Sequence, residues 1–207
     1  MVDIFETKEA CTSYLMWNDN HEGFIVDPGY NYHDCLINHI KKMDVIIKAI
    51  LLTHAHYDHI GALEDVVKAF PDCITYIYKN ELDLLTDPRK NLSFCSKKLD
   101  YLPNKLCEVD DNESFEVSGF QIKVLHTPFH THGSCCFYLE KENILFSGDT
   151  LFRSSIGRED LPTGSSKTIS SSLAKLLNLP DKTLIYPGHG PKTDLGREKN
   201  YNSYLKI

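Results

Sequence analysis

The chain has 207 residues, of which 42% are hydrophobic, and 22 Lys and Arg against 29 Asp and Glu give a net charge of −7. This length and apolar content suffice for one buried core, so we predict a single domain over residues 1–207. The acidic balance disfavours a nucleic-acid partner, whose binding depends on phosphate neutralisation, and no apolar run approaches the roughly 20 residues that cross a membrane.

The first half of the chain predicts short strands that alternate with helices. Expected strands lie at 12–16, 23–27, 49–52 and 74–78, and expected helices at 33–43, 63–70 and 80–85. The strand at 49–52 is a continuous apolar run, which predicts burial on both faces. Residues 86–105 are polar and irregular, typical of a surface loop or of a flap beside a substrate.

The second half is again rich in strands. We expect strands at 114–117, 120–125, 135–139 and 144–147, a final strand at 183–186, and helices at 166–178 and 195–204. No linker rich in Gly, Pro or Ser divides the two halves. The pattern therefore predicts an α/β fold, a four-layer αββα sandwich with two sheets inside and helices outside.

The seven cysteines are scattered, with no Cys-x-x-Cys pair. The first residues, Met1-Val2-Asp3-Ile4, show no basic region followed by an apolar stretch, so no secretory signal is visible. Reduced thiols in a cytoplasmic protein are the expectation. The oligomeric state stays open.

A dense cluster of metal-competent side chains follows the strand at 49–52. Within six residues lie His54, His56, Asp58 and His59. Side chains alternate along an extended chain, so His54 and His56 point the same way. Imidazole nitrogen and carboxylate oxygen suit zinc and other first-row metals. The alternative is a polar loop whose histidines cap the helix after Gly61.

Three further segments follow predicted strands and could complete such a site. They are His126–Ser134, Ser147–Thr150 and Tyr186–Gly190. Loops at strand ends flanked by Gly and Pro are where rigid scaffolds present functional groups. Each segment alone is a weak signal, but together with the first cluster they supply enough ligands for two metals.

These motifs resemble the metallo-β-lactamase fold superfamily, and within it the hydroxyacylglutathione hydrolases (glyoxalase II) and their short relatives. The matching pieces are His54-x-His56-x-Asp58-His59, Thr127-Pro128-x-His130-x-x-Gly133-Ser134, Gly148-Asp149-Thr150-Leu151-Phe152, Gly157-Arg158-x-Asp160-Leu161-Pro162 and Pro187-Gly188-His189-Gly190. They follow the order of the family over nearly the whole chain.

The resemblance implies a metal-binding set of seven residues. One ion would be held by His54, His56 and His130, the other by Asp58, His59 and His189, with Asp149 bridging both. Two divalent ions are expected, zinc first, with iron or manganese as alternatives. Metals lower the pKa of bound water to about 7, so a bridging hydroxide is available to a hydrolase.

The implied substrate is a small-molecule thioester, S-lactoylglutathione or another hydroxyacylglutathione. Asp58 would be the catalytic residue that orients the hydroxide. Glutathione specificity carries over less firmly, because full-length relatives have an extra C-terminal helical segment that this sequence lacks. Candidate substrate contacts are Tyr57, Arg89 and Asn91.

The sequence departs from the family at two positions of the His130 loop. Phe129 stands where Gly is usual and could narrow the mouth of the site, and His132 stands where Pro is frequent and could compete with His130 for the metal. We prefer His130 because it follows Thr-Pro-x. His126 is expected to have a structural hydrogen-bonding role.

Two residues are expected to support the site from outside the metals. Asp27 resembles an aspartate that orients the ligand loop, although an ordinary turn residue before Pro28 would look the same. Arg158 is expected to form a structural ion pair with Asp160 rather than to act in catalysis.

Alternative functions remain in other classes. A persulfide dioxygenase of the same fold would use a single iron at His54, His56 and His130. A non-catalytic metal-binding module would require loss of a ligand. A β-lactamase is disfavoured because Cys is usual where Asp149 stands and because His59 is extra. A nuclease is disfavoured by the acidic charge.

Overall fold

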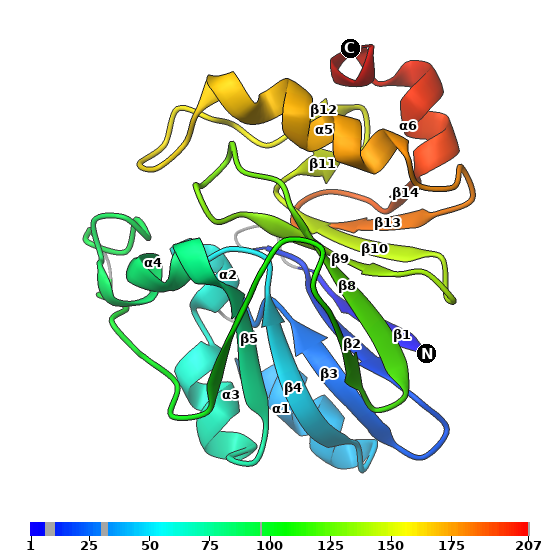
Figure 1. Cartoon of the computed structure of the whole chain (residues 1–207). Helices are drawn as coiled ribbons and strands as arrows, with labels where there is room; N and C mark the ends of the chain where they lie inside the picture. The colour runs from blue at the N-terminus through cyan, green and yellow to red at the C-terminus, as the bar shows by residue number, and fades with distance from the viewer. Residues whose placement is uncertain (7–10, 30–32, 96, 207) are drawn as a thin grey trace.

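Two six-stranded sheets pack face to face, with helices on both outer surfaces (Figure 1). The computed structural model describes residues 1–6, 11–29, 33–95 and 97–206. The first sheet contains β1 (Val2–Phe5), β2 (Ser13–Trp17), β3 (Glu22–Val26), β4 (Ile46–Leu52), β5 (Ile74–Tyr78) and β6 (Leu106–Val109), in this order. Strands β3 to β6 are parallel to one another, and β1 and β2 are antiparallel additions.

The second sheet is mostly antiparallel. In spatial order it contains β14 (Thr193–Asp194), β13 (Leu184–Pro187), β10 (Ile144–Gly148), β9 (Cys135–Leu139), β8 (Phe120–His126) and β7 (Ser114–Val117). Only β10 and β13 pair in parallel. A short hairpin of β11 (Leu151–Phe152) and β12 (Ser155–Ile156) follows β10.

Helices cover the two outer faces. The first sheet carries α1 (His33–Lys42) and α3 (Leu63–Ala69), and the second carries α5 (Ile169–Leu177) and α6 (Leu195–Tyr201) (Figure 1). The remaining helices are α2 (Tyr57–Ile60) and α4 (Leu82–Thr86), with single 3-10 turns at Lys79–Glu81, Ser166–Thr168 and Ser203–Leu205.

Strand β4 shows why the sheets are sandwiched between helices. Ala49 and Leu51 point into the apolar layer between the two sheets, whereas Ile50 and Leu52 pack with α1 and α3. All four side chains are fully buried. A third apolar cluster lies between the second sheet and α5. The predicted αββα architecture is thereby confirmed.

Most expected elements lie within three residues of their predicted bounds, and the differences have physical causes. The strand expected at 183–186 is β13, but it is not the last strand, because β14 follows and pairs with it through Leu184 and Ile185. Two-residue strands such as β14, β11 and β12 are too short to show periodicity. Strands β1 and β6, which form the two edges of the first sheet, were not predicted from the sequence pattern.

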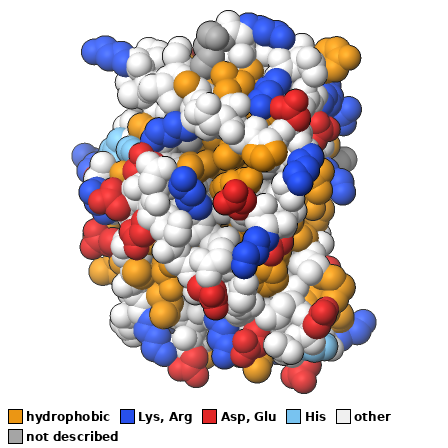
Figure 2. Space-filling view, turned by 45° about the vertical axis from the view of Figure 1, so that its right-hand side comes forward, with side chains coloured by type: hydrophobic (Ala, Val, Ile, Leu, Met, Phe, Trp, Pro, Cys, Tyr) orange, Lys and Arg blue, Asp and Glu red, His pale blue; other side chains and the backbone are white. Residues whose placement is uncertain are grey.

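The surface carries charges of both signs. On the face shown in Figure 2, acidic and basic side chains alternate among apolar ones, without a continuous basic patch. Among the described residues, no helix is both long and apolar enough to span a membrane.

Candidate metal centre

Strand ends bring the predicted metal-binding side chains to one edge of the two sheets. His54 and His56 follow β4, Asp149 follows β10, and His189 follows β13. His130 comes from the loop between β8 and β9, while Asp58 and His59 lie in α2 directly after the β4 loop. Carboxyl ends of parallel strands meet at the same edge of a sheet. The predicted ligands that follow these strands therefore converge at that edge, although they are far apart in the sequence.

The seven predicted ligands form overlapping groups whose ligand atoms lie within 4.8 Å of one another. These groups are His54 with His56 and His130, His54 with His59 and Asp149, and Asp58 with His59 and His189. The structure therefore brings together all seven residues that the sequence singled out.

Asp149 lies between the histidines of the two ends of the cluster. Its Oδ1 is 3.4 Å from His59 Nε2, and its Oδ2 is 3.4 Å from His130 Nε2 and 3.5 Å from His189 Nε2. His189 Nε2 also lies 3.1 Å from Asp58 Oδ2. One carboxylate that faces three imidazoles has the placement of a bridging ligand.

Unpartnered polar atoms test whether metal ions fit this cluster. His54 Nε2, His56 Nε2, His59 Nε2 and Asp149 Oδ1 are buried and have no hydrogen-bond partner in the described part of the chain. Leaving such groups unsatisfied costs about 1–3 kcal/mol each. Divalent cations bound by nitrogen and oxygen lone pairs would satisfy atoms of this kind, so the residues fit a metal centre.

Asp27 fixes the orientation of two of the imidazoles. Its Oδ2 accepts hydrogen bonds from His59 Nδ1 at 2.9 Å and from Thr53 Oγ1 at 2.6 Å. Since the Thr53 hydroxyl donates to Asp27, it is left to accept from His54 Nδ1, at 3.2 Å. Both Nε2 atoms therefore face the cluster. This geometry fits the predicted supporting role of Asp27.

His130 is oriented by the main chain of Arg158. Its Nδ1 donates to the Arg158 carbonyl at 2.7 Å, which leaves Nε2 unprotonated and 2.9 Å from His56 Nδ1. Two lone pairs this close repel each other unless a proton or a cation lies between them. The Arg158 guanidinium points to the Asp160 carboxylate through two hydrogen bonds of 2.6 and 2.7 Å, the expected ion pair.

Electrostatics acts in opposite directions on different imidazoles of the cluster, lowering the pKa of two of them and raising the pKa of His59. Burial lowers the pKa of His54 well below its ordinary value, and burial together with the His130 charge lowers the pKa of His56 to about 3. Burial alone would raise the pKa of Asp149, but the charges of His59 and His130 hold it well below its usual range. His59 is the imidazole whose pKa is raised. Burial alone would lower its pKa, but the acidic groups around it, Cys11 and Asp58 first, raise that pKa well above the ordinary value. Metals require neutral imidazoles beside ionised carboxylates, so His54 and His56 are already in the binding form, whereas His59 would release its proton when a metal binds.

A cavity of about 410 Å³ opens above the cluster. Besides cluster residues it is lined by Tyr57, Leu92, Phe152, Gly157, Arg158 and Leu161. Tyr57, a predicted substrate contact, therefore lies on the cavity wall. Arg89 is exposed and does not line it, so the structure gives no support for that predicted contact.

Asn91, the third predicted substrate contact, has a different position. It is fully buried, and its amide donates to the carbonyls of Leu84 and Leu99 at 2.8 Å each. Its own carbonyl accepts from Tyr57 N. The side chain therefore joins α4 to the segment around Leu99, the main chain of Asn91 contacts α2, and Asn91 does not line the cavity. The neighbouring Leu92, which sequence reasoning missed, lines the cavity.

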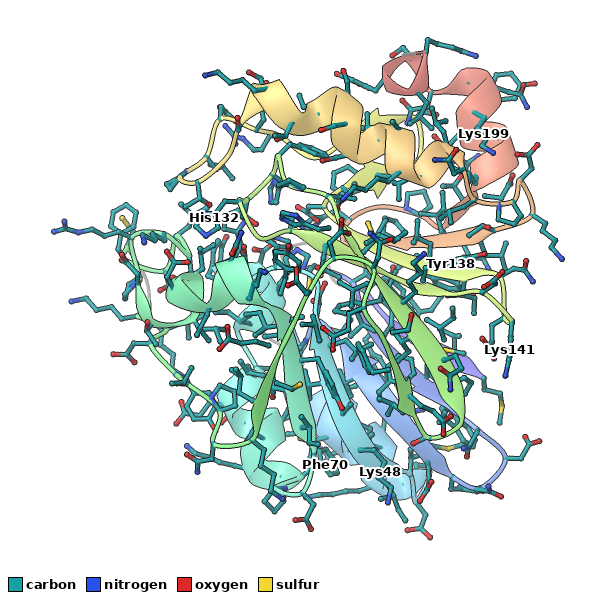
Figure 3. The ribbon with its side chains drawn as sticks, viewed as in Figure 1. Lys48, Phe70, His132, Tyr138, Lys141 and Lys199 are labelled. Carbon is teal, nitrogen blue, oxygen red and sulfur yellow. The ribbon has the colours of Figure 1, made fainter. Side chains whose placement is uncertain are left out.

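The departures in the His130 loop do not disturb the cluster. His132 lies beside α4, with Nε2 3.2 Å from Asp83 Oδ1, and does not compete with His130 (Figure 3). Phe129 is buried in the apolar cluster below α5, so the expectation that it narrows the mouth is wrong. His126 donates to the His132 carbonyl at 3.0 Å and stacks on Tyr78, a structural role as expected.

Two glycines allow the loops to approach Asp149. A Cβ on Gly188 would collide with Asp149 Oδ1 and lie 2.7 Å from His59 Cε1. A Cβ on Gly157 would collide with the Asp149 carbonyl and lie 3.3 Å from His130 Nδ1. Gly157 and Gly188 therefore stand in their motifs because there is no room for a side chain beside Asp149.

Glu81 is a residue of the site region that sequence reasoning missed. It is fully buried directly after β5 and contacts the loops that carry His54, His56 and His130. Burial raises the pKa of its carboxyl to about 7. The sequence placed Glu81 in a short helix, and its only signal was its position after a predicted strand end.

Comparison with known proteins agrees with this geometry. The family model of the metallo-beta-lactamase superfamily matches residues 7–189. A probable metallo-hydrolase of Bacillus subtilis, YqgX, is 35% identical over 93% of this chain and 91% of its own length. The hydroxyacylglutathione hydrolase GloC of Haemophilus influenzae is also 35% identical, over 92% of this chain and 91% of its own.

Solved structures are similar over the whole fold. A structure described as the BLEG-1 B3 metallo-beta-lactamase has a TM-score of 0.93 and 36% identity, with 100% of both chains covered. The protein TTHA1623, crystallised in a di-iron-bound form, has a TM-score of 0.83 and 34% identity, with 97% of this chain and 98% of that chain covered.

Proposed function

Because the chain belongs to the metallo-beta-lactamase superfamily, we propose that it is a binuclear metal-dependent hydrolase of a thioester, S-lactoylglutathione or another hydroxyacylglutathione. The observation that carries this proposal is the carboxylate of Asp149, which faces His59, His130 and His189 at 3.4 to 3.5 Å. A relative of similar length is described as a hydroxyacylglutathione hydrolase, which supports the substrate class.

Each end of the cluster would hold one ion. His54, His56 and His130 would bind the first, Asp58, His59 and His189 the second, and Asp149 would be shared. When bound, the two ions would polarise the thioester carbonyl and supply hydroxide near neutral pH. Zinc is the expected metal, and iron or manganese suits the same ligands.

The side chains of the protein would then position the reactants. Asp58, whose Oδ2 lies 3.1 Å from His189 Nε2, would orient the hydroxide. Tyr57, Leu92 and Phe152 would shield the reacting carbonyl from bulk water on the cavity wall. Low water content strengthens the electrostatic interactions inside such a site.

The cavity wall favours a thioester over an amide. A thiolate leaves without being protonated, whereas an amine must receive a proton. Apart from the cluster, the titratable side chains that line the cavity in the described chain are Tyr57 and Arg158. The Arg158 guanidinium is already paired with Asp160, so it is poorly placed as a proton donor.

A second candidate is hydrolysis of a β-lactam ring, because the similar BLEG-1 structure is described as a B3 metallo-beta-lactamase. A single-iron persulfide dioxygenase has less support, since Asp58, His59 and His189 form a second group of ligands. A non-catalytic module has less support for the same reason. We also propose a cytoplasmic location, consistent with seven free cysteines.

The test is a substrate panel on metal-loaded protein. We expect release of free thiol from S-lactoylglutathione, loss of that activity with a chelator, and recovery when metal is returned. Cleavage of a chromogenic cephalosporin without thioesterase activity would favour the β-lactam candidate, and oxygen consumption with glutathione persulfide would favour the dioxygenase. Full metal loading with no thiol released from any acyl-thiol rejects the proposal.

A further inference from the structure

Glu81 is a buried carboxylate that joins the two loops of the first histidine group. It lies in the 3-10 turn Lys79–Glu81 after β5 and is fully buried. Its Oε1 accepts from Ala55 N at 2.9 Å. Its Oε2 accepts from Thr131 Oγ1 at 2.8 Å and from Gly133 N at 3.0 Å.

The donors belong to segments that carry ligands. Ala55 stands between His54 and His56 in the chain, and Thr131 directly follows His130. One carboxylate therefore connects the loop after β4 to the loop between β8 and β9. These loops come from different sheets, so the strands alone do not fix their separation.

The loop between β8 and β9 allows Glu81 to approach closely because it has a glycine at the point of contact. Gly133 has no Cβ, and a Cβ there would lie 2.5 Å from Glu81 N and from its Oε2. The Thr131 amide donates to Ser134 Oγ at 3.0 Å, so the loop is braced internally. Glu81 ties this braced loop to the loop after β4, beside the backbone hydrogen bond from Cys135 N to the Thr53 carbonyl at 2.9 Å.

The Glu81 carboxylate is buried at an energetic cost that its neutral hydrogen-bond donors offset only in part. The hydrogen-bond donors to the Glu81 carboxylate are two backbone amides and a hydroxyl, none of them a cation. A buried carboxylate without a cationic partner is costly, and neutral donors offset only part of that cost. An apolar side chain of similar size would avoid this cost but would leave the Ala55 and Gly133 amides and the Thr131 hydroxyl without an acceptor, so the carboxylate is what holds these donors together.

We propose that Glu81 is a positioning residue that sets the separation of His54 and His56 from His130, and with it the affinity of the first metal position. This inference rests on the proposed metal-dependent function. It concerns metal binding itself, so it is tested without any substrate.

The main test is E81Q, which keeps the size of the side chain. The new amide presents two hydrogens to a site that contains only donors, so at least one hydrogen bond is lost. We expect zinc affinity at one of the two positions, measured by competition with a chromophoric chelator, to fall about 10- to 100-fold. The other position should keep its affinity. At saturating zinc, kcat should fall more than KM rises.

Two further variants sharpen the test. T131V removes the hydroxyl that donates to Glu81 and should lower the same zinc affinity by a smaller factor. E64Q, on the exposed face of α3, removes a carboxylate that pairs with Lys68 and should change nothing. If E81Q does not fold, the zinc affinity of T131V decides.

Unchanged zinc affinity in folded E81Q, or in T131V where E81Q does not fold, would overturn the inference. A lower melting temperature alone would then indicate a structural role. If wild-type protein binds two ions but hydrolyses no thioester, the proposed function fails while the inference about Glu81 is still decided by the zinc titration.

Discussion

Asp149 is the residue on which the two-metal interpretation depends most. Without a shared anion, the ligand groups on either side of Asp149 would be two separate sites for one metal ion each. Its carboxylate oxygens face different imidazoles, Oδ1 towards His59 and Oδ2 towards His130 and His189. A shared carboxylate also offsets part of the repulsion between two cations.

Replacing Asp149 with Asn should therefore abolish the binuclear state. The amide keeps the size of the side chain but is a poor bridging ligand. We expect D149N to fold, to bind fewer ions, and to lose at least about 100-fold in kcat/KM. Asp72, whose side chain is 98% exposed, provides the matched control D72N, which should keep its metal content and activity. Full activity in D149N would contradict the bridging role.

Glu81 also gives a prediction on pH and stability. Its folded-state pKa of about 7 lies above the ordinary value of 4.5. Between pH 4.5 and about pH 7, the folded protein keeps a proton on Glu81 that the unfolded chain has lost. Rising pH in this window therefore lowers the free energy of unfolding. In chelator-treated protein, the unfolding free energy of wild type relative to E81Q should decline from about pH 4.5 to about pH 7, by at most roughly 3 kcal/mol. Denaturant titrations across this window measure it, and a constant difference would refute it.

At the scale of elements, strand ends explain both what the sequence predicts and what it misses. The apolar run at 49–52 and the motifs after it indicated a buried strand followed by ligands, and β4 has this arrangement. Short edge strands such as β1 and β6 gain their order from neighbours, which periodicity does not report. Polar residues in an irregular segment are expected to be exposed, whereas Asn91 is fully buried, and the sequence pattern carries no signal of that burial.

The loop after β13 depends on the absence of a side chain at Gly188. The variant G188A should push Asp149 or His59 out of place, because its methyl group would collide with both. We expect weaker metal binding and about 10- to 100-fold lower activity. G119A is the control: Gly119 has φ +82° with no atom near the added methyl group, so it should cost about 1 kcal/mol of stability and leave metal binding intact. Equal metal affinity in the two variants would argue against this account.

The segment after α4 depends on Asn91. N91A leaves the carbonyls of Leu84 and Leu99 without their donor, which should cost about 1–3 kcal/mol in unfolding free energy. Because Leu92 and Tyr57 line the cavity beside it, we expect KM to rise as well. The exposed N178A should stay within about 0.5 kcal/mol of wild type. A loss of stability in N91A without any change in KM would show that this segment does not affect substrate binding.

At the scale of the whole molecule, the site exists only because two sheets meet. The first sheet supplies Asp27, His54 and His56, and the second supplies Asp149 and His189. The residues alone predicted the cluster at His54–His59 and three candidate segments at strand ends, and the family resemblance supplied the individual ligands within those segments. Neither predicted the supports that cross between sheets, such as Glu81 to Thr131, because contacts of long sequence separation leave no local pattern.

The number of metal ions per folded chain tests the central claim most directly. Elemental analysis of protein that was stripped with chelator, reloaded and freed of excess metal should give two ions per chain, paired with recovered thioesterase activity. A content that never exceeds one ion per chain, with zinc, iron or manganese supplied in turn, would contradict the binuclear site.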